Sequence, residues 1–291
     1  MTRGVWATAL ALIAATGCID TGQDQVSIPI RLAGTSVAAP VSSANGWSIE
    51  LTRADLAFGP LYLCPGYQAG SLCDTARMEW IETAVVNALD PEVDDAGALD
   101  GVTGPVRSWM YDLGIASLLT QQRPEPLSAA QALDGNSVRI EGVASKGPHA
   151  MPFLIEIPIQ QEEATEIGVS VVRKSGSDRF EHVITGNETA LTVRFDPGPW
   201  VRDVDFDTLV ENASCTPGGP TSVCADSREL TCSATGAIEA ERDCSPIGLA
   251  CVRGRGCVDR VTFTPESQAY RAVKGALVAG TRPSFEWSSA P

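Results

Sequence analysis

The stretch from residue 153 to residue 159 reads FLIEIPI, and it shows most plainly how this chain folds. Its apolar residues Phe153, Ile155, Ile157 and Ile159 occur at every second position, so their side chains would share one face of an extended strand. A strand with one apolar face and one wetter face is typical of a sheet that packs against a core on one side.

Similar short patterns recur along the chain. Turn-forming Gly, Pro, Asn and Asp residues separate them, and the lack of regular strand–helix alternation argues against a doubly wound parallel sheet. The sequence therefore predicts an all-β fold, an antiparallel β-sandwich of the immunoglobulin-like or jelly-roll-like kind. The predicted strands are Val26–Leu32, Trp47–Phe58, Leu61–Leu63, Trp80–Leu89, Val138–Val143, Phe153–Ile159, Ile167–Arg173, Phe180–Ile184, Leu191–Phe195, Val261–Thr264 and Ser284–Trp287.

Two short helices and two long loops complete this prediction. Thr264 as N-cap and Pro265 at the first helical position indicate a helix that ends near Gly280. A second short helix is predicted from Phe206 to Asn212. Residues 90–107 and 120–137 are rich in Asp, Gly, Pro and Ala, and we expect them to form loops.

The N-terminal residues are typical of an export signal. Arg3 precedes the apolar run Val5–Ala15, which is too short to cross a hydrocarbon core of about 30 Å as a helix. Residues 1–17 are therefore predicted to be a signal peptide. No later stretch is a candidate transmembrane segment.

The sequence Ala15-Thr16-Gly17-Cys18 resembles the lipobox of bacterial lipoproteins. In that family the cysteine is acylated, by chains such as palmitate, and becomes the first residue of the mature protein. The resemblance implies a firm lipid anchor on Cys18, with residues 18–25 as a lipidated tether. Because Ile19 rather than Asp follows the cysteine, the sorting rule of enteric lipoproteins implies the outer membrane, on its periplasmic or surface face.

The chain has nine cysteines, and eight remain if Cys18 carries lipid. Even numbers of closely spaced cysteines in an exported protein predict disulfides. Cys64 and Cys73 flank a turn-rich segment and are predicted to pair. The remaining six would form three bridges whose connectivity the spacing leaves open, and the lack of a C-x2-C pair argues against zinc. These six are Cys215, Cys224, Cys232, Cys244, Cys251 and Cys257.

The late cysteines define a predicted module. Residues 213–259 contain many glycines and few large apolar side chains, so their folding would depend on the bridges. Residues 260–291 again carry core-type side chains such as Phe285 and Trp287. We therefore expect a cysteine-rich module at 213–259, inserted into a β-sandwich domain made of residues 26–212 and 260–291.

The composition narrows the range of partners. The chain has 291 residues, and 21 Lys and Arg stand against 36 Asp and Glu, a formal net charge of -15. Binding to nucleic acid needs clustered basic residues, so this balance argues against a nucleic-acid partner.

Common catalytic motifs are absent from the sequence: G-x-S-x-G, S-x-x-K, H-E-x-x-H, the P-loop and G-x-G-x-x-G. A Ser–His–Asp or Cys–His site would need His149, in a loop-like setting, or His182, in a strand-like one. His182 alternates with Phe180 and Ile184, as an ordinary sheet histidine would. The sequence thus predicts no enzyme, no catalytic residue and no cofactor. A secreted hydrolase whose scattered site cannot be recognised in sequence stays an alternative.

The densest acidic run is a weak metal-site candidate. It comprises Asp90, Glu92, Asp94, Asp95 and, farther on, Asp100. Calcium prefers oxygen ligands, but the run lacks the glycine and the final glutamate of an EF-hand. A calcium- or other metal-binding envelope module using this loop is one hypothesis, and a solvated acidic loop is the other.

Together these features predict a lipid-anchored cell-envelope protein with a non-catalytic binding or structural role. It would meet the membrane through its lipid anchor. Loops held on a rigid sandwich are suited to recognition, so we expect a protein or glycan ligand in the envelope or outside it.

Overall fold

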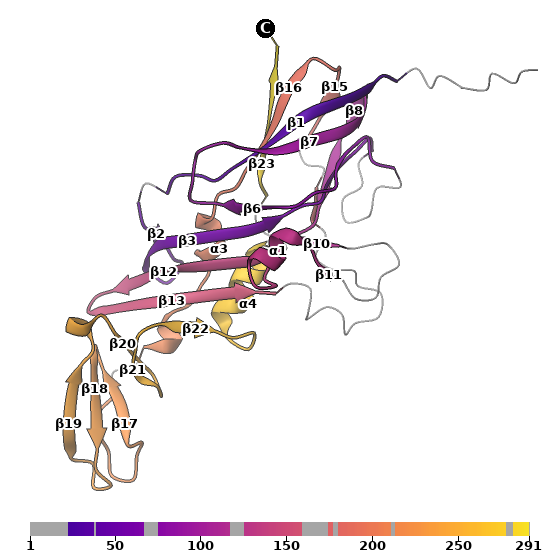
Figure 1. The fold of residues 1–291 in the computed structure, drawn as a ribbon. Coiled ribbons are helices and arrows are strands. Elements are labelled where there is room, and N and C mark those ends of the chain that lie inside the picture. The colour runs from indigo at the N-terminus through magenta and orange to yellow at the C-terminus, as the bar shows by residue number, and fades with distance from the viewer. Residues whose placement is uncertain are drawn as a thin grey trace, which may run out of the picture.

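The computed structural model describes residues 23–37, 39–66, 75–116, 125–158, 174–176, 180–210, 213–277 and 282–290. Strands dominate, and the all-β prediction is confirmed. Figure 1 shows two large curled sheets with a small three-stranded meander projecting from one end.

The larger sheet has eight strands, and all neighbours are antiparallel except β1 and β16, which run parallel. In spatial order they are β14 (Lys174–Gly176), β9 (Ser108–Tyr111), β4 (Leu61–Cys64), β5 (Met78–Trp80), β7 (Asp94–Val102), β1 (Gln25–Ala33), β16 (Glu188–Arg194) and β23 (Ser284–Ser289).

The second sheet has six strands. Their order is β2 (Val41–Ser42), β3 (Ser48–Phe58), β12 (Val138–Lys146), β13 (His149–Ile157) and β22 (Val261–Phe263), with β6 (Ala84–Asn87) pairing with β3 outside this path. Strands β12 and β13 form a long hairpin, and β22 pairs in parallel with β13.

Smaller elements connect and flank the two sheets. The short strands are β8 (Gly104–Val106), which pairs with β15 (His182–Ile184), β10 (Ile115–Ala116), which pairs with β11 (Glu125–Pro126), and β20 (Ala250–Val252), which pairs with β21 (Gly256–Val258). The meander is β17 (Ser222–Ala225), β18 (Arg228–Cys232) and β19 (Ile238–Asp243). The helices are α1 (Ser128–Ala132), α3 (Gly198–Val201), α4 (Gln268–Gly275) and the 3-10 turns η2 (Asp207–Leu209) and η3 (Ser245–Ile247).

The alternation in FLIEIPI is realised in β13. Phe153, Ile155 and Ile157 are at most 1% exposed, and they belong to one hydrophobic cluster that includes residues of both sheets. In register, Ile155 lies between Ile140 of β12 and Phe263 of β22. Burial of this apolar face is therefore what holds the second sheet against the first.

The predicted strand Trp80–Leu89 is two strands. Strand β5 pairs with β4 and β7 in the larger sheet, whereas β6 pairs with β3 in the smaller one. The intervening Ile81–Thr83 carries the chain from one sheet to the other. The apolar pattern of residues 80–89 does not indicate the change of sheet, because β5 and β6 both contribute side chains to the same core.

The prediction of a loop at 90–107 is wrong. Residues 94–102 form β7, between β1 and β5, and residues 104–106 form β8. Ladder hydrogen bonds come from the backbone, so an acidic strand is stable if its polar side chains face water. In β7 only Leu99 is fully buried. The prediction of a loop at 120–137 is also wrong where β11 and α1 form.

The predicted helix exists but begins later than expected. Its N-cap is Ser267, whose hydroxyl accepts a hydrogen bond from the Tyr270 N–H at 3.2 Å. Thr264 instead closes a preceding turn, in which its carbonyl accepts from the Ser267 N–H at 2.9 Å and from the Ser267 hydroxyl at 2.7 Å. Near Phe206 the predicted helix is only the 3-10 turn η2, and residues 211–212 lie outside the described residues, as does the predicted strand 167–173. Within the described ranges no helix is long and apolar enough to cross a membrane.

Candidate functional site

The six late cysteines form three disulfides, as predicted. The pairs are Cys215–Cys232, Cys224–Cys251 and Cys244–Cys257. Cys64 is also disulfide-bonded, but its predicted partner Cys73 lies outside the described residues, and so does the proposed lipidation site Cys18. The Cys64–Cys73 pairing stays a prediction.

The bridges divide the cysteine-rich segment into two parts. Cys215–Cys232 closes the meander on itself, whereas the other two bridges connect the meander to the β20–β21 hairpin. That hairpin is part of the domain core, because Ala250 and Val252 are buried in the main hydrophobic cluster. After it the chain returns to both sheets through β22 and β23. Two disulfides thus connect the meander to the domain core.

Four of the five acidic candidates line one groove. It lies between β6 and the β1–β7 pair, has a volume of about 200 Å³, and includes the buried Leu32 in its lining. The carboxylates around it are those of Asp90, Glu92, Asp94 and Asp95. The fifth candidate, Asp100, does not line this groove.

The groove does not have the geometry of a metal centre. The Asp95 carboxylate accepts a hydrogen bond from Arg31 Nε at 2.9 Å, and one Asp90 oxygen accepts from the Glu92 N–H at 3.0 Å. Across the described part of the chain, no three His, Cys, Asp or Glu residues are placed to hold one ion. The acids are neighbours here, but they do not converge.

His182 belongs to a compact unit that sequence analysis did not reveal. Its imidazole stacks on the indole of Trp287, with ring centroids 4.2 Å apart and an interplanar angle of 8°. Its Nε2 lies 3.1 Å from Oε1 of Glu188, whose side chain is 2% exposed. Beside an ionised carboxylate the ring donates its Nε2 proton, which leaves Nδ1 as the acceptor in the neutral form.

Glu188 is buried in ionised form. Burial by itself raises the pKa of a carboxyl group, but here hydrogen bonds outweigh it and the pKa of Glu188 is lowered. Besides His182, the carboxylate accepts from the Thr185 N–H at 3.0 Å, the Thr185 hydroxyl at 3.0 Å and the Gly186 N–H at 2.9 Å. These donors come from the turn between β15 and β16.

His149 lies in a second aromatic and charged cluster. It is the first residue of β13 rather than part of a loop, and its ring lies 6.4 Å from that of Trp47. The indole N–H of Trp47 donates to Asp207 at 2.8 Å, and Lys146 Nζ donates to the same carboxylate at 2.8 Å. Hydrogen bonds from Lys146 and Trp47 lower the pKa of Asp207. This cluster fixes the β12–β13 turn against η2.

Neither histidine is hydrogen-bonded to a nucleophilic side chain in the described residues, although His149 lines a small pocket with Ser227 and Ser245. Among the described residues, no side-chain hydrogen bond joins His149 or His182 to Ser, Thr or Cys; the partner of His182 is Glu188. The seven described cysteines are bonded in disulfides. Within these ranges no hydrogen-bonded pair of the Ser–His or Cys–His kind is formed.

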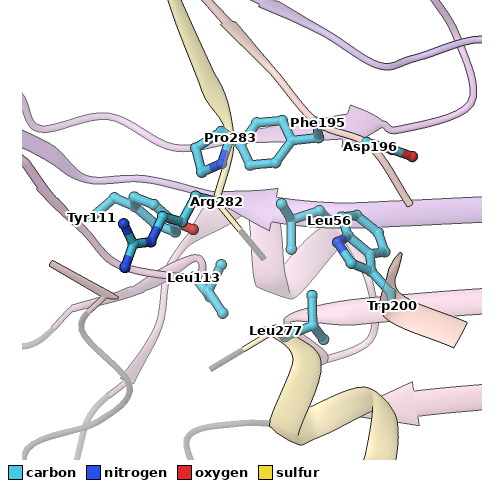
Figure 2. Close-up of a pocket in the computed structure, with 9 residues that line it drawn as sticks. All are labelled: Leu56, Tyr111, Leu113, Phe195, Asp196, Trp200, Leu277, Arg282 and Pro283. Carbon is cyan, nitrogen blue, oxygen red and sulfur yellow. The ribbon is translucent and has the colours of Figure 1, made fainter. Parts of the chain in front are cut away.

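The pocket in Figure 2 lies between the sheets and α4. It has room for about one water molecule, with a volume of about 10 Å³. Its polar rim includes Tyr111, whose pKa is raised by burial, and Arg282. The lining residues are Leu56, Tyr111, Leu113, Phe195, Asp196, Trp200, Leu277, Arg282 and Pro283. It is a packing defect rather than a ligand cavity.

Comparisons with known proteins give little further guidance. No family model matches the chain, and no curated protein matches it. One solved structure, MbnP from Methylosinus trichosporium, aligns with 92% of this chain and 99% of its own at 13% identity, with a TM-score of 0.32. A likeness at this level supports no argument about fold or function.

Proposed function

We propose that the chain is a lipid-anchored cell-envelope protein whose role is binding rather than catalysis. The observation that carries the proposal is the lipobox-like Ala15-Thr16-Gly17-Cys18, followed after six residues by the folded domain, which begins at Gln25. A cysteine that carries lipid and a short tether are what a peripheral anchored domain needs.

The proposal of a non-catalytic role rests on the surroundings of the two histidines, which a Ser–His or Cys–His site would need. His182 is stacked on an indole and held by a buried carboxylate, and His149 packs beside Trp47. The disulfide-held meander and the acidic groove instead offer shaped, solvent-exposed surfaces. A protein or glycan ligand in the envelope or outside it fits such surfaces.

Replacing Cys18 by Ser is expected to move the protein from the membrane fraction to the soluble fraction. Serine cannot form the thioether to which the lipid is attached, so the variant would lose the acyl chains that hold it to the bilayer. Fractionation of cells followed by immunoblotting measures the distribution. The matched control is Thr21→Ser, a change of similar size in the tether, which should stay with the membrane. A Cys18→Ser protein that has lost residues 1–17 and still requires detergent for extraction would show that lipid does not anchor it.

A calcium-binding role for the acidic groove is the alternative, and the geometry does not favour it. A bound ion at 100 times its dissociation constant would stabilise the fold by about 2.7 kcal/mol. We expect millimolar calcium to leave the melting temperature unchanged, because the carboxylates do not converge. A rise that Glu92→Gln with Asp94→Asn abolishes, and that Glu50→Gln with Glu239→Gln preserves, would establish a calcium module instead.

A further inference from the structure

The polypeptide enters the folded domain at a fixed corner. The N–H of Asp24 donates to the Thr103 hydroxyl at 3.1 Å, and the N–H of Thr103 donates to the Asp24 carbonyl at 2.9 Å. Asp24, near the end of the proposed tether of residues 18–25, is thus bound to the turn between β7 and β8.

Two other segments meet at this corner. Strand β8 follows Thr103 and pairs with β15, which places Val183 opposite Pro105. The turn after β15 lies against the start of β1, since a Cβ built on Gly186 would be 3.4 Å from Val26 Cγ1. We call this surface the entry end, and define it as Asp24, Thr103–Pro105, Val183–Asn187 and Ala290, whose N–H donates to the Asn187 carbonyl.

The length of the tether limits where the entry end can be. Six residue steps separate Cys18 from Asp24, and a fully extended chain spans at most about 3.5 Å per step, or about 20 Å in all. If Cys18 is embedded through its lipid, Asp24 must lie close to the bilayer surface.

The entry end and the meander lie at opposite ends of the molecule. Figure 1 shows β8, β15 and the start of β1 at the upper end, and β17, β18 and β19 at the lower end. An orientation that brings the entry end to the bilayer therefore holds the meander away from it.

The entry end also has the surface chemistry for a bilayer. In a chain with a net charge of -15, the segments Thr103–Pro105 and Val183–Asn187 contain no carboxylate, and Asp24 carries the one acidic side chain of the entry end. Val183 is 57% exposed, and beside it the His182 ring stacks on the partly buried Trp287. Indole rings are suited to the boundary between headgroups and water. By contrast, every residue of β19 is exposed, and Glu239, Glu241 and Asp243 alternate along it.

We propose that the entry end lies against the lipid bilayer and that the meander faces outward as the partner-facing end. This inference rests on the lipid anchor of the proposed function. The entry end contacts a lipid surface. The tether is too short for the domain to reorient freely relative to that surface.

Photo-crosslinking at two matched positions tests the orientation. Val183 and Ile238 are 57% and 56% exposed, and they lie at the entry end and in β19. Val183→p-benzoylphenylalanine and Ile238→p-benzoylphenylalanine, each in the lipidated protein in phospholipid vesicles, are irradiated, and lipid adducts are measured by intact mass. We expect about tenfold more adduct at position 183, because the tether holds position 238 out of reach. Equal adducts, more adduct at 238, or none at either position would overturn the proposal.

A second arm separates this inference from the anchor itself. Residues 1–18 are replaced by a hexahistidine tag, and the protein is attached to vesicles through nickel-chelating lipids. Adducts at 183 in this arm, with no membrane association of the natural chain, would mean that the anchor on Cys18 is wrong, while a chain held at this point does turn its entry end to the bilayer. Association of the natural chain without a preference for 183 would mean the reverse.

Discussion

Replacing Cys224 and Cys251 together by alanine is expected to lower the stability of the fold by about 3.5 kcal/mol, because that bridge closes a loop with a sequence separation of 27 residues. Both cysteines are at least 95% buried. The bridge connects the meander to β20, and β20 belongs to the main core through Ala250 and Val252. The loss should therefore reach the main domain.

The matched control is the replacement of Cys215 and Cys232 by alanine. This bridge has a sequence separation of 17 residues, and its removal would cost about 3 kcal/mol on the same chain-entropy model. Because it lies within the meander, that cost should stay local. Urea unfolding followed by tryptophan fluorescence reports on the main domain, and protease cleavage within residues 216–231 reports on the meander.

We expect a lower urea midpoint only for the Cys224 and Cys251 variant, and faster cleavage for both variants. Equal midpoints for the two variants would contradict the claim that β20 couples the meander to the core.

Glu188→Gln is expected to destabilise the fold by about 3 kcal/mol, the usual cost of disrupting a buried hydrogen-bonded charge. The carboxylate accepts from two backbone N–H groups, a hydroxyl and His182. A glutamine amide brings two N–H donors into this site, where the surrounding groups are donors and need an acceptor. At least one buried donor would then face another donor.

Glu188 also makes the stability of the fold depend on pH. The pKa of Glu188 is lowered in the folded state, so its contribution to stability is fully present above the unfolded pKa of about 4.3 and is lost as the pH falls through the folded value. Between neutral pH and pH 3, the melting temperature of the natural chain should fall more steeply than that of Glu188→Gln. Glu286→Gln is the control, because its half-exposed side chain in the same sheet makes a long ion pair with Arg194 at 3.5 Å and accepts a long hydrogen bond from the Ser284 hydroxyl at 3.4 Å. Parallel pH profiles for Glu188→Gln and the natural chain would contradict this account.

The strands were predictable wherever one face had to be buried. The alternation in FLIEIPI identified β13 because burial of Phe153, Ile155 and Ile157 leaves a period of two in the sequence. Strand β7 left no such signal, since only Leu99 is fully buried and the backbone ladder to β1 supplies the rest. Hydropathy cannot reveal a strand that backbone pairing holds in place.

The candidate sites were predictable only in part. The even number of cysteines predicted three late bridges, but their pairing depends on how β17, β20 and β21 come together. His182 and Glu188 are close in sequence, and Thr185-Gly186-Asn187 between them is a turn signal that could have suggested their contact. Trp287 is 105 residues from His182 in the chain, so only the pairing of β23 with β16 brings it there.

The proposed lipid anchor on Cys18 determines where the protein lies in the cell, and intact-protein mass spectrometry of the membrane-extracted protein tests it most directly. The protein is measured with and without reduction and alkylation. Its mass should be that of a chain that begins at Cys18 and carries acyl groups, and reduction should expose eight thiols. A mass without acyl groups, or a chain that begins at another residue, would contradict the anchor and with it the proposed place of this protein in the cell envelope.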